Sequence, residues 1–220
     1  MRVIDLTMPI APHWRYGLEQ RPARRFDEGS VVQTTWFALQ THWYTHIDVP
    51  RHFSPDGATL EQYPLDLLVG DAVILDVSDQ GENAPIDAGK LEKAFAGLAR
   101  RDIILVKSCR GRKVSMDSRE FWDGSPYLTA DAADWLYSLE PKVVGFDFPQ
   151  DRDIRRRDLP DNEKEHTTHE RLLRRGVLLI EYLTNFWSLG EAGIIRFAGL
   201  PLKLIGVDGA PIRAVALLDA

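Results

Sequence analysis

Apolar residues recur along this chain in short runs of strand length, separated by polar and turn-forming stretches. Runs of this kind, rich in β-branched and aliphatic residues and bounded by turn residues, are typical of β-strands. The pattern predicts strands at residues 3–6, 31–39, 72–77, 103–106, 143–146, 177–180 and 212–218.

Helical periodicity is rarer, and it falls between the strand-like runs. Asp87 and Thr129 are candidate N-caps for two helices, and Gly176 follows a third at the position where helices favour glycine. The helices are predicted at residues 88–98, 130–139 and 166–175. Because strands outnumber helices and mix with them, the sequence predicts a single α/β domain over residues 1–220 with a mixed sheet.

Two long stretches fit neither pattern. Residues 9–29 are rich in proline, arginine and aromatic residues, and residues 149–165 are densely charged. Long loops inside a compact domain are uncommon and tend to be functional or disordered. We therefore expect each stretch to flank a functional site, with a mobile surface loop as the alternative for the second.

Composition narrows the class of protein. The net charge of −6 argues against a nucleic-acid partner, which requires a basic excess. No apolar run approaches the length that crosses a bilayer, and the N-terminus lacks the apolar stretch of a signal peptide. A single cysteine, Cys109, excludes an internal disulfide. We expect a cytoplasmic protein that acts on a small molecule.

The most informative segment is residues 42–52, which holds three of the six histidines of the chain. Imidazole and carboxylate are ligands that zinc, manganese and iron accept, whereas calcium prefers oxygen alone. In a strand, His42, His46 and Asp48 would share one face, and in a helix His42 and His46 still would. The alternative, unrelated surface or core histidines, would leave this clustering to chance.

Three ligands leave a metal with an open position, which distinguishes a catalytic site from a structural one. Further ligands are expected from residues 165–173 and 176–183. Glu181 ends an apolar run, so its carboxylate faces either solvent at the strand tip or a ligand at the sheet edge. A buried and unpaired carboxylate would be costly there, and a metal partner would explain it.

Residues 42–52 resemble the signature H-x-G-T-H-x-D-x-P-x-H of a family of metal-dependent hydrolases, the cyclase family, which includes bacterial kynurenine formamidase and isatin hydrolase. Every fixed position matches except that Tyr44 replaces the glycine. The similarity spans most of the chain, and a histidine again precedes a glutamate by twelve residues at His169 and Glu181. Further similar segments are residues 5–10, 64–70, 75–78, 201–203 and 209–214.

The resemblance implies a fold, a metal site and an assembly. The fold would be a mixed, β-rich core with flanking helices, of the swivelling β/β/α type, usually assembled as a homodimer or homotetramer. His42, His46 and Asp48 would hold one divalent ion, and Asp48 and Glu181 would bridge to a second held also by His169. His52 would transfer protons. Zinc is the first choice of metal, with manganese as the alternative and one or two ions in the site.

Two departures from the family lie where substrate choice is set. If residues 42–48 form a strand, the phenol of Tyr44 stands between two metal ligands and contacts substrate; if the backbone needs a positive φ, tyrosine is strained there. Gln150 and Arg152 stand where relatives carry serine and aspartate. Trp14, in the proline-rich stretch, is a further candidate for substrate contact.

The predicted activity is hydrolysis of an amide or related acyl bond of a small molecule, with an aromatic substrate as one option. A divalent ion would activate water, and His52 would pass a proton to the leaving nitrogen. Two alternatives remain at this point. One is a ligand-binding protein that lost catalysis through Tyr44, and the other is a cyclase or dehydratase that uses the same ions.

Overall fold

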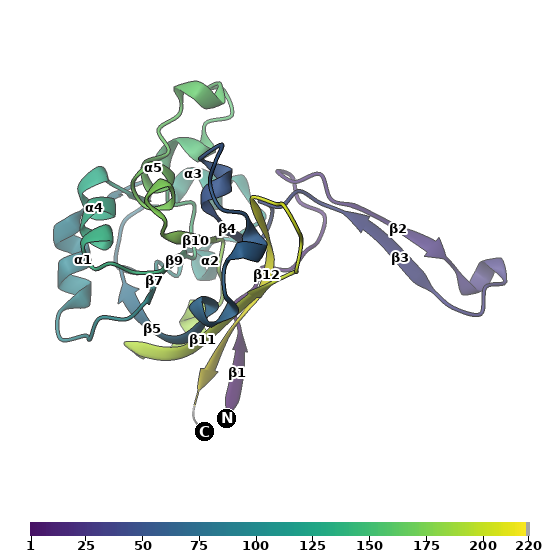
Figure 1. The fold of residues 1–220 in the computed structure, drawn as a ribbon, viewed down its shortest axis with the longest axis horizontal. Helices are drawn as coiled ribbons and strands as arrows, with labels where there is room; N and C mark the ends of the chain where they lie inside the picture. Colours follow the sequence, from purple (N-terminus) through teal and green to yellow (C-terminus); the bar gives the residue numbers. More distant parts are fainter. Residues whose placement is uncertain (219–220) are drawn as a thin grey trace.

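The apolar runs pair into one large mixed sheet in the computed structural model, which describes residues 1–218 (Figure 1). Its strand order is β1-β12-β11-β5-β7-β9-β10-β4, and β5, β7, β9 and β10 run parallel. The strands are β1 (Arg2–Asp5), β4 (His46–Asp48), β5 (Val69–Asp76), β7 (Ile103–Lys107), β9 (Val143–Phe146), β10 (Leu178–Glu181), β11 (Ile194–Pro201) and β12 (Gly209–Leu218).

The sheet closes on itself, because β4 pairs with β12 as well as with β10. Residues 209–211 of β12 pair with β4, and residues 215–218 of the same strand pair with β1. Closure leaves a barrel-like sheet in which the short strand β4 has a hydrogen-bonded neighbour on both sides. The mixed α/β fold expected from the sequence is confirmed.

Alternate residues of each strand enter two different cores. On β5, Ala72 and Ile74 point into the barrel, whereas Val73 and Leu75 face the helices. Strands buried on both faces read as continuous apolar runs, which is why these strands were predictable. The predicted runs at 72–77, 103–106, 143–146 and 177–180 all coincide with strands.

Helices α1 (Ala88–Phe95), α4 (Ala130–Ser138) and α5 (Thr167–Arg171) cover one outer face of the sheet (Figure 1). Asp87 caps α1 as expected, since its side chain accepts from the Lys90 N–H. Thr129 is the N-cap residue of α4, as expected, but its hydroxyl makes no capping bond to the helix and donates instead to the Ile86 carbonyl. The third predicted helix is shorter, because α5 ends at Arg171 and a 3₁₀ turn at Leu173–Arg175 leads to Gly176.

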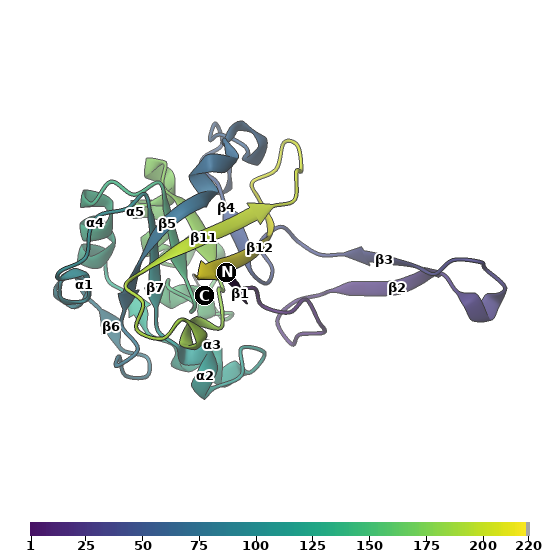
Figure 2. The same ribbon diagram turned by 90° about the horizontal axis from the view of Figure 1, so that it is seen from below.

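The long proline-rich stretch is not a loop throughout. Residues 9–29 contain β2 (Glu19–Arg24), which pairs with β3 (Thr34–Ala38) in a hairpin that projects far from the body (Figures 1 and 2). Every residue of β2 is exposed, so no core imposes an apolar alternation on it. This explains why the pattern missed β2. It also missed β11, the short pair β6 (Pro85–Ile86) and β8 (Tyr127–Leu128), and the short helices α2 (Arg110–Lys113) and α3 (Arg119–Gly124).

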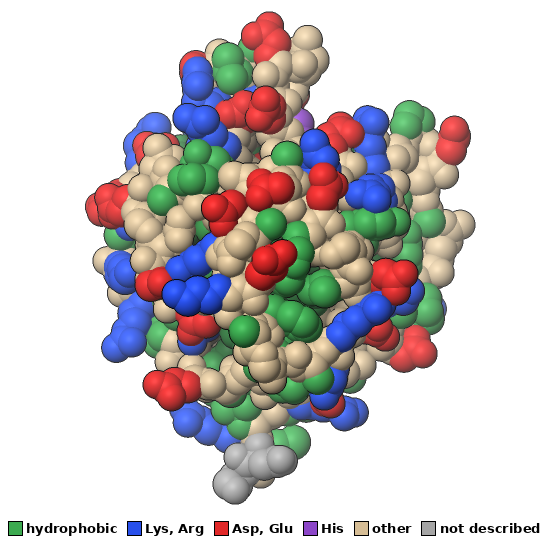
Figure 3. All heavy atoms as spheres, turned by 90° about the vertical axis from the view of Figure 1, so that its left-hand side faces the viewer, with side chains coloured by type: hydrophobic (Ala, Val, Ile, Leu, Met, Phe, Trp, Pro, Cys, Tyr) green, Lys and Arg blue, Asp and Glu red, His purple; other side chains and the backbone are tan. Residues whose placement is uncertain are grey.

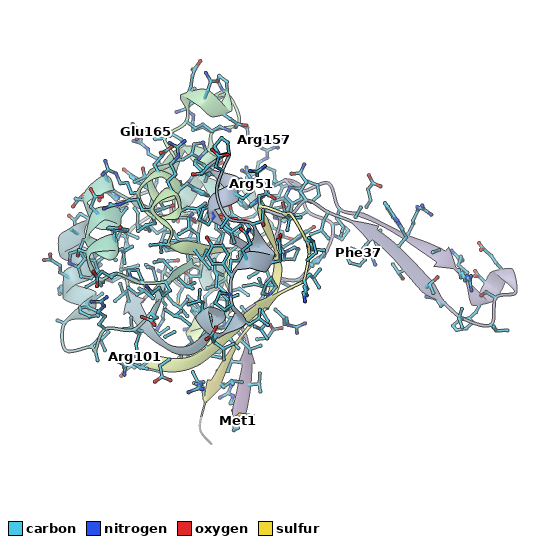
Figure 4. The ribbon with its side chains drawn as sticks, in the orientation of Figure 1. Met1, Phe37, Arg51, Arg101, Arg157 and Glu165 are labelled. Atoms are coloured by element: carbon cyan, nitrogen blue, oxygen red, sulfur yellow. The ribbon has the colours of Figure 1, made fainter. Side chains whose placement is uncertain are left out.

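The charged stretch also projects from the body, above α5 in Figure 1, and it contains 3₁₀ turns at Arg152–Arg155 and Asp161–Glu163. Arg157 and Glu165 lie on either side of this projection (Figure 4). On the face that carries α1 and α4, acidic and basic side chains are interspersed (Figure 3). No helix among the described residues is both long and apolar enough to cross a membrane.

Candidate metal centre

Strand register places three predicted ligands on one face. Ile47 and Val49 point into the barrel core, so His46 and Asp48 point to the opposite face. Glu181, the last residue of β10, lies directly across from His46 in the antiparallel pair. His46 and Asp48 therefore converge with Glu181 from the adjacent strand, although Glu181 comes more than 130 residues later in the sequence.

Asp48 lies at the centre of the cluster. Its Oδ1 lies 2.6 Å from His42 Nδ1 and 3.1 Å from His46 Nε2. Its Oδ2 lies 3.5 Å from Nε2 of His169, which comes from α5. Asp48 thus presents one oxygen to each of two groups of possible ligands, His42–His46–Asp48 and Asp48–His169–Glu181, and each group has ligand atoms within 4.8 Å of one another.

Glu181 spans both groups in the same way. Its Oε2 lies 3.6 Å from His46 Nε2, and its Oε1 lies 3.4 Å from His169 Nε2. The five residues that the sequence suggested as ligands are brought together, and Asp48 and Glu181 each face histidines of both groups.

The chemistry of this donor set fits a divalent ion. Asp48 is completely buried, and its Oδ2 has no hydrogen-bond partner among the described residues. A buried carboxylate oxygen without a partner is costly, and a cation at this point would compensate for it. Burial alone would raise the pKa of Asp48, but the neighbouring His46 and His42 hold it well below its usual range.

Each candidate histidine ligand is anchored through its second ring nitrogen. His46 Nδ1 donates to the Tyr44 carbonyl at 2.8 Å, and His169 Nδ1 lies 2.6 Å from Asp151 Oδ2. His42 Nε2 lies 2.8 Å from Asp208 Oδ2. Such contacts fix the orientation of a metal-binding imidazole, because they leave the other nitrogen to face the ion.

Sequence reasoning missed Asp151 and Asp208. Asp208 lies 166 positions from the histidine that it contacts, and nothing in the local sequence predicts that pairing. Burial alone would lower the pKa of His42, but Asp48 and Asp208 raise it to about 9. Burial would also lower the pKa of His169, but its hydrogen bonds with Asp151 and Asp48 raise that pKa well above its usual value.

A glycine beside the cluster allows this packing. A Cβ added to Gly209 would lie 2.5 Å from the carbonyl oxygen of Ile47 and 2.8 Å from Cε1 of His42. Any side chain there would displace β4 or the imidazole. The glycine next to Asp208 is therefore part of what positions His42.

Tyr44 does not stand among the metal ligands, which corrects the expectation of a strand from residue 42. β4 begins only at His46, and Tyr44 has a φ of 58°. Its ring is buried in a cluster with Tyr16 and Trp122, and its hydroxyl donates to the Ala11 carbonyl. Of the two possibilities for residue 44, a strand or a backbone with positive φ, the structure has the second.

Trp14 lies beside the site. Its ring packs between the guanidinium groups of Arg119 and Arg157, with ring-centroid distances of 4.6 and 5.9 Å. The two residues that follow it, Arg15 and Tyr16, line the cavity that opens onto the candidate ligands. Within residues 1–218, Trp14 itself does not line this cavity.

A cavity of about 510 Å³ opens onto the ligand cluster. It is lined by Arg15, Tyr16, His42, Trp43, His46, Asp48, His52, Ile154, Arg157, Leu159, Pro160, Asp161, Lys164, His169, Glu181 and Tyr182. Both long stretches without a predicted element contribute to this wall. A cavity of this volume suits a small molecule.

His52 lines the cavity without joining the two ligand groups around Asp48. Its ring stacks on His42 at a centroid distance of 3.7 Å, and its Nδ1 lies 3.5 Å from Asp208 Oδ2. Burial, with the positive charges of His42 and His169, lowers the pKa of His52 to about 4. The imidazole is therefore neutral at pH 7.

The second departure from the family pattern also reaches the cluster. Gln150 is fully buried, and its amide Nε2 donates to Glu181 Oε1 and to Thr168 Oγ1, the latter at 3.2 Å. Arg152 is exposed, and its guanidinium lies over the ring of Tyr127. Arg152 does not belong to the residues within 1–218 that line the cavity. Gln150 thus orients a candidate ligand, whereas Arg152 does not contact the site.

Comparison with known proteins places the chain in a family. The sequence model described as "Putative cyclase" matches residues 4–150. The chain belongs to the Cyclase family. A kynurenine formamidase of Salinibacter ruber is 32% identical over 229 residues, covering 100% of this chain and 99% of that protein. A kynurenine formamidase of Bacillus thuringiensis is 30% identical and covers 86% of this chain and 82% of that protein.

Solved structures support the same fold. A predicted metal-dependent hydrolase from Bacillus stearothermophilus has a TM-score of 0.72 at 27% identity, covering 98% of this Cyclase-family chain and 97% of that one. An isatin hydrolase bound to the product analogue thioisatinate has a TM-score of 0.82 at 20% identity, covering 99% and 92%. The barrel-like sheet and its helices are therefore the family's architecture.

Proposed function

We propose that this Cyclase-family protein hydrolyses the C–N bond of an amide in a small molecule and that it uses one or two divalent ions. The observation that carries the proposal is the convergence of three histidines and two buried carboxylates, Asp48 and Glu181, in one cluster, where Asp48 Oδ2 has no hydrogen-bond partner within residues 1–218. The names of similar proteins, a formamidase and an isatin hydrolase, support a C–N bond as the target. Zinc is our first choice and manganese the alternative, because both accept these ligands.

A divalent ion in this position supplies an activated water and polarises a carbonyl. The chain itself supplies proton transfer and orientation. Neutral His52 is placed to take a proton on the ring nitrogen that does not face Asp208, and then to deliver it to the leaving nitrogen. Asp208 holds both His42 and His52 in place, because one of its oxygens faces both rings.

The test of His52 separates a catalytic role from a ligand role. We expect His52→Ala to abolish turnover of N-formyl arylamines or cyclic amides, measured by product formation, while the metal content by elemental analysis stays that of the wild type. Loss of the metal together with activity would make His52 a ligand and contradict the assignment. Incorporation of labelled oxygen from water into the product would distinguish hydrolysis from cyclisation or dehydration.

We also propose that the protein self-associates through the hairpin of β2 and β3. A two-stranded hairpin is marginally stable alone in water, and this one exposes apolar side chains. Figure 4 shows Phe37 on the hairpin, outside the barrel, and the other exposed apolar residues there are Phe26, Val31, Val32 and Trp36. A second copy that covers this surface would stabilise the hairpin by burying it.

Sedimentation or light scattering tests the assembly. We expect the wild type to be at least dimeric and Phe37→Glu to shift it towards the monomer. Leu65→Glu is the matched control, because Leu65 is 58% exposed and Phe37 56%, and Leu65 lies on a 3₁₀ turn away from the hairpin. An unchanged mass for Phe37→Glu would contradict an interface at the hairpin.

A further inference from the structure

Basic side chains from two remote segments meet at the cavity that opens onto the candidate metal ligands. Arg15 comes from the segment before the hairpin, and Arg157 and Lys164 come from the projecting segment 152–165. None of these three residues lies in a strand or an α-helix, so the regular packing of such an element does not explain a basic residue at these positions. Their meeting at one cavity therefore points to a ligand.

Arg15 is held in place without a negative partner. Its guanidinium Cζ lies 4.2 Å from the ring centroid of buried Trp122, and its Nη2 donates to the Ile154 carbonyl at 2.8 Å. An aromatic face and a carbonyl orient a cation but leave its full charge in place.

Arg157 likewise keeps its charge. The Cζ of its guanidinium lies over the ring of Trp14, 5.9 Å from the ring centroid. Within residues 1–218, neither Arg157 nor Arg15 forms an ion pair with an acidic side chain. Lys164 differs, because its Nζ lies 2.6 Å from Asp161 Oδ1. Two guanidinium groups thus remain uncompensated at the cavity.

The acidic residues of the cavity do not neutralise these two arginines. Asp161 pairs with Lys164, and Asp48 and Glu181 face the histidines of the candidate metal centre. A divalent ion there would occupy both carboxylates. Since a guanidinium forms a planar fork that matches a carboxylate with two hydrogen bonds, an anionic group of a ligand is the natural partner.

We propose that the substrate is an amide that also carries a carboxylate, and that Arg15 and Arg157 bind this carboxylate while the amide lies against the metal ligands. The proposal rests on the proposed function for the position of the amide. It adds a second recognition site in the same cavity and names the two residues that determine specificity.

The test compares formanilide with its 2-, 3- and 4-carboxylate derivatives on the metal-loaded enzyme. These probes share the same formamide and ring and differ in the carboxylate. We expect at least one carboxylate derivative to have a kcat/KM about tenfold to hundredfold above that of formanilide, the range given by one hydrogen-bonded charge pair. Equal kcat/KM values for all four compounds would overturn the proposal and leave hydrolysis intact.

Variants assign the effect to the two arginines. Arg157→Gln, at an exposed position, is expected to raise KM for the preferred carboxylate about tenfold more than it raises KM for formanilide. Arg15→Gln should do the same and Arg15→Lys should restore part of the affinity, which separates a charge effect from misfolding. An equal loss on formanilide and on the carboxylate would contradict a carboxylate-binding role.

Arg152→Gln is the matched control, because it removes the same charge from the same segment but lies outside the described cavity lining. It should leave KM for the carboxylate at the wild-type value. An increase as large as that of Arg157→Gln would show a general field effect and overturn the assignment of direct contact.

A binding measurement separates this proposal from the proposed function. By calorimetry, benzoate should bind the metal-loaded wild type at least tenfold more tightly than benzamide, and Arg157→Gln should abolish the difference. If none of the four formamides is hydrolysed but benzoate binding depends on Arg157, the proposed reaction fails and the anion site stands. If Arg157→Gln binds benzoate as the wild type does, the anion site fails whatever the turnover.

Discussion

Tyr44 illustrates how a single residue can be strained and still contribute to stability. Its φ of 58° lies in the left-handed region, where a non-glycine residue costs about 1–2 kcal/mol. Its ring is buried against Tyr16, and its carbonyl accepts from His46. The expectation of lost catalysis depended on a phenol among the ligands, and the buried position removes that reason.

Replacement of this tyrosine by the glycine of the family signature should therefore destabilise the protein. Tyr44→Gly relieves the strain but removes a fully buried aromatic ring, a loss of about 3–5 kcal/mol, so we expect a net loss of about 1–4 kcal/mol. Denaturant unfolding measures it. Tyr44→Phe, which keeps the ring, should cost about 1 kcal/mol through the hydroxyl alone. A Tyr44→Gly protein as stable as the wild type would contradict the packing argument.

An ion pair between a buried lysine and a half-exposed aspartate makes a pH-dependent contribution to stability at the ends of β5 and β7. Asp76 Oδ2 lies 2.7 Å from the Nζ of Lys107, which is nearly buried. Burial alone would raise the pKa of Asp76, but hydrogen bonds from Lys107 and Ser78 lower it. A lowered carboxyl pKa stabilises the fold above the unfolded-state pKa, and this stabilisation is lost as the pH falls through the folded-state pKa.

We expect Asp76→Asn to lower the free energy of unfolding by about 1–2 kcal/mol at pH 7, since the Lys107 ammonium exchanges a charged partner for a neutral amide and otherwise contacts the neutral Gly190 carbonyl. Because Asp76 is half exposed, this is less than a fully buried pair would lose. The difference from the wild type should shrink below pH 4, as the native carboxyl protonates. A difference that stays constant from pH 7 to pH 3 would contradict this account.

Among the elements, the projecting segment 152–165 matters most for function, because it forms part of the cavity wall. Arg155 ties it to the body. Its Nη2 donates to the carbonyls of Pro126 and Pro149 at 2.7 and 3.1 Å, and its Nη1 donates to Asn83 Oδ1 at 3.2 Å. Burial lowers the pKa of Arg155 to about 10, which still leaves it charged at neutral pH.

We expect Arg155→Ala to loosen this segment. Limited proteolysis at the remaining basic residues of the segment should become several times faster, and KM for a substrate should rise, because local opening grows as the ties are lost. Arg156→Ala is the matched control, since Arg156 is exposed and its side chain pairs only with Asp158 in the described chain. Equal proteolysis rates for both variants would show that the hydrogen bonds of Arg155 do not hold the segment against the body.

For the whole molecule, the candidate metal centre links elements that are remote in sequence. His46 lies on β4, which closes the barrel, Glu181 ends β10, and His169 comes from helix α5 on the outer face. An ion bound there would link the closed sheet to helix α5. Anything that binds only the folded state stabilises it, by about 2.7 kcal/mol at a concentration one hundred times Kd.

Chelation should therefore lower the thermal midpoint, and added zinc or manganese should restore it, as measured by calorimetry with metal content determined in parallel. Glu181→Gln, which removes a bridging charge, should show a smaller shift on chelation. A midpoint that does not change when the metal is removed would contradict a link between the ion and the fold.

Sequence alone determined the features that depend on local spacing. The strands β5, β7, β9 and β10 were predictable because burial on both faces makes them continuous apolar runs. The clustering of three histidines and an aspartate in residues 42–52 predicted a metal site, because ligand type and spacing are encoded in a short segment. Glu181 was a candidate from its position at the end of an apolar run, and the resemblance to the family paired it with His169.

Tertiary structure decided what depends on pairing between remote segments. Only the register of β4 against β10 places Glu181 across from His46, and only closure onto β12 brings Asp208 to His42. Only the buried aromatic cluster turns Tyr44 away from the ligands, and only the fold brings Arg15 and Arg157 to one cavity. The physical reason is that local periodicity encodes which face is buried, whereas the partner of that face is selected by packing over the whole chain.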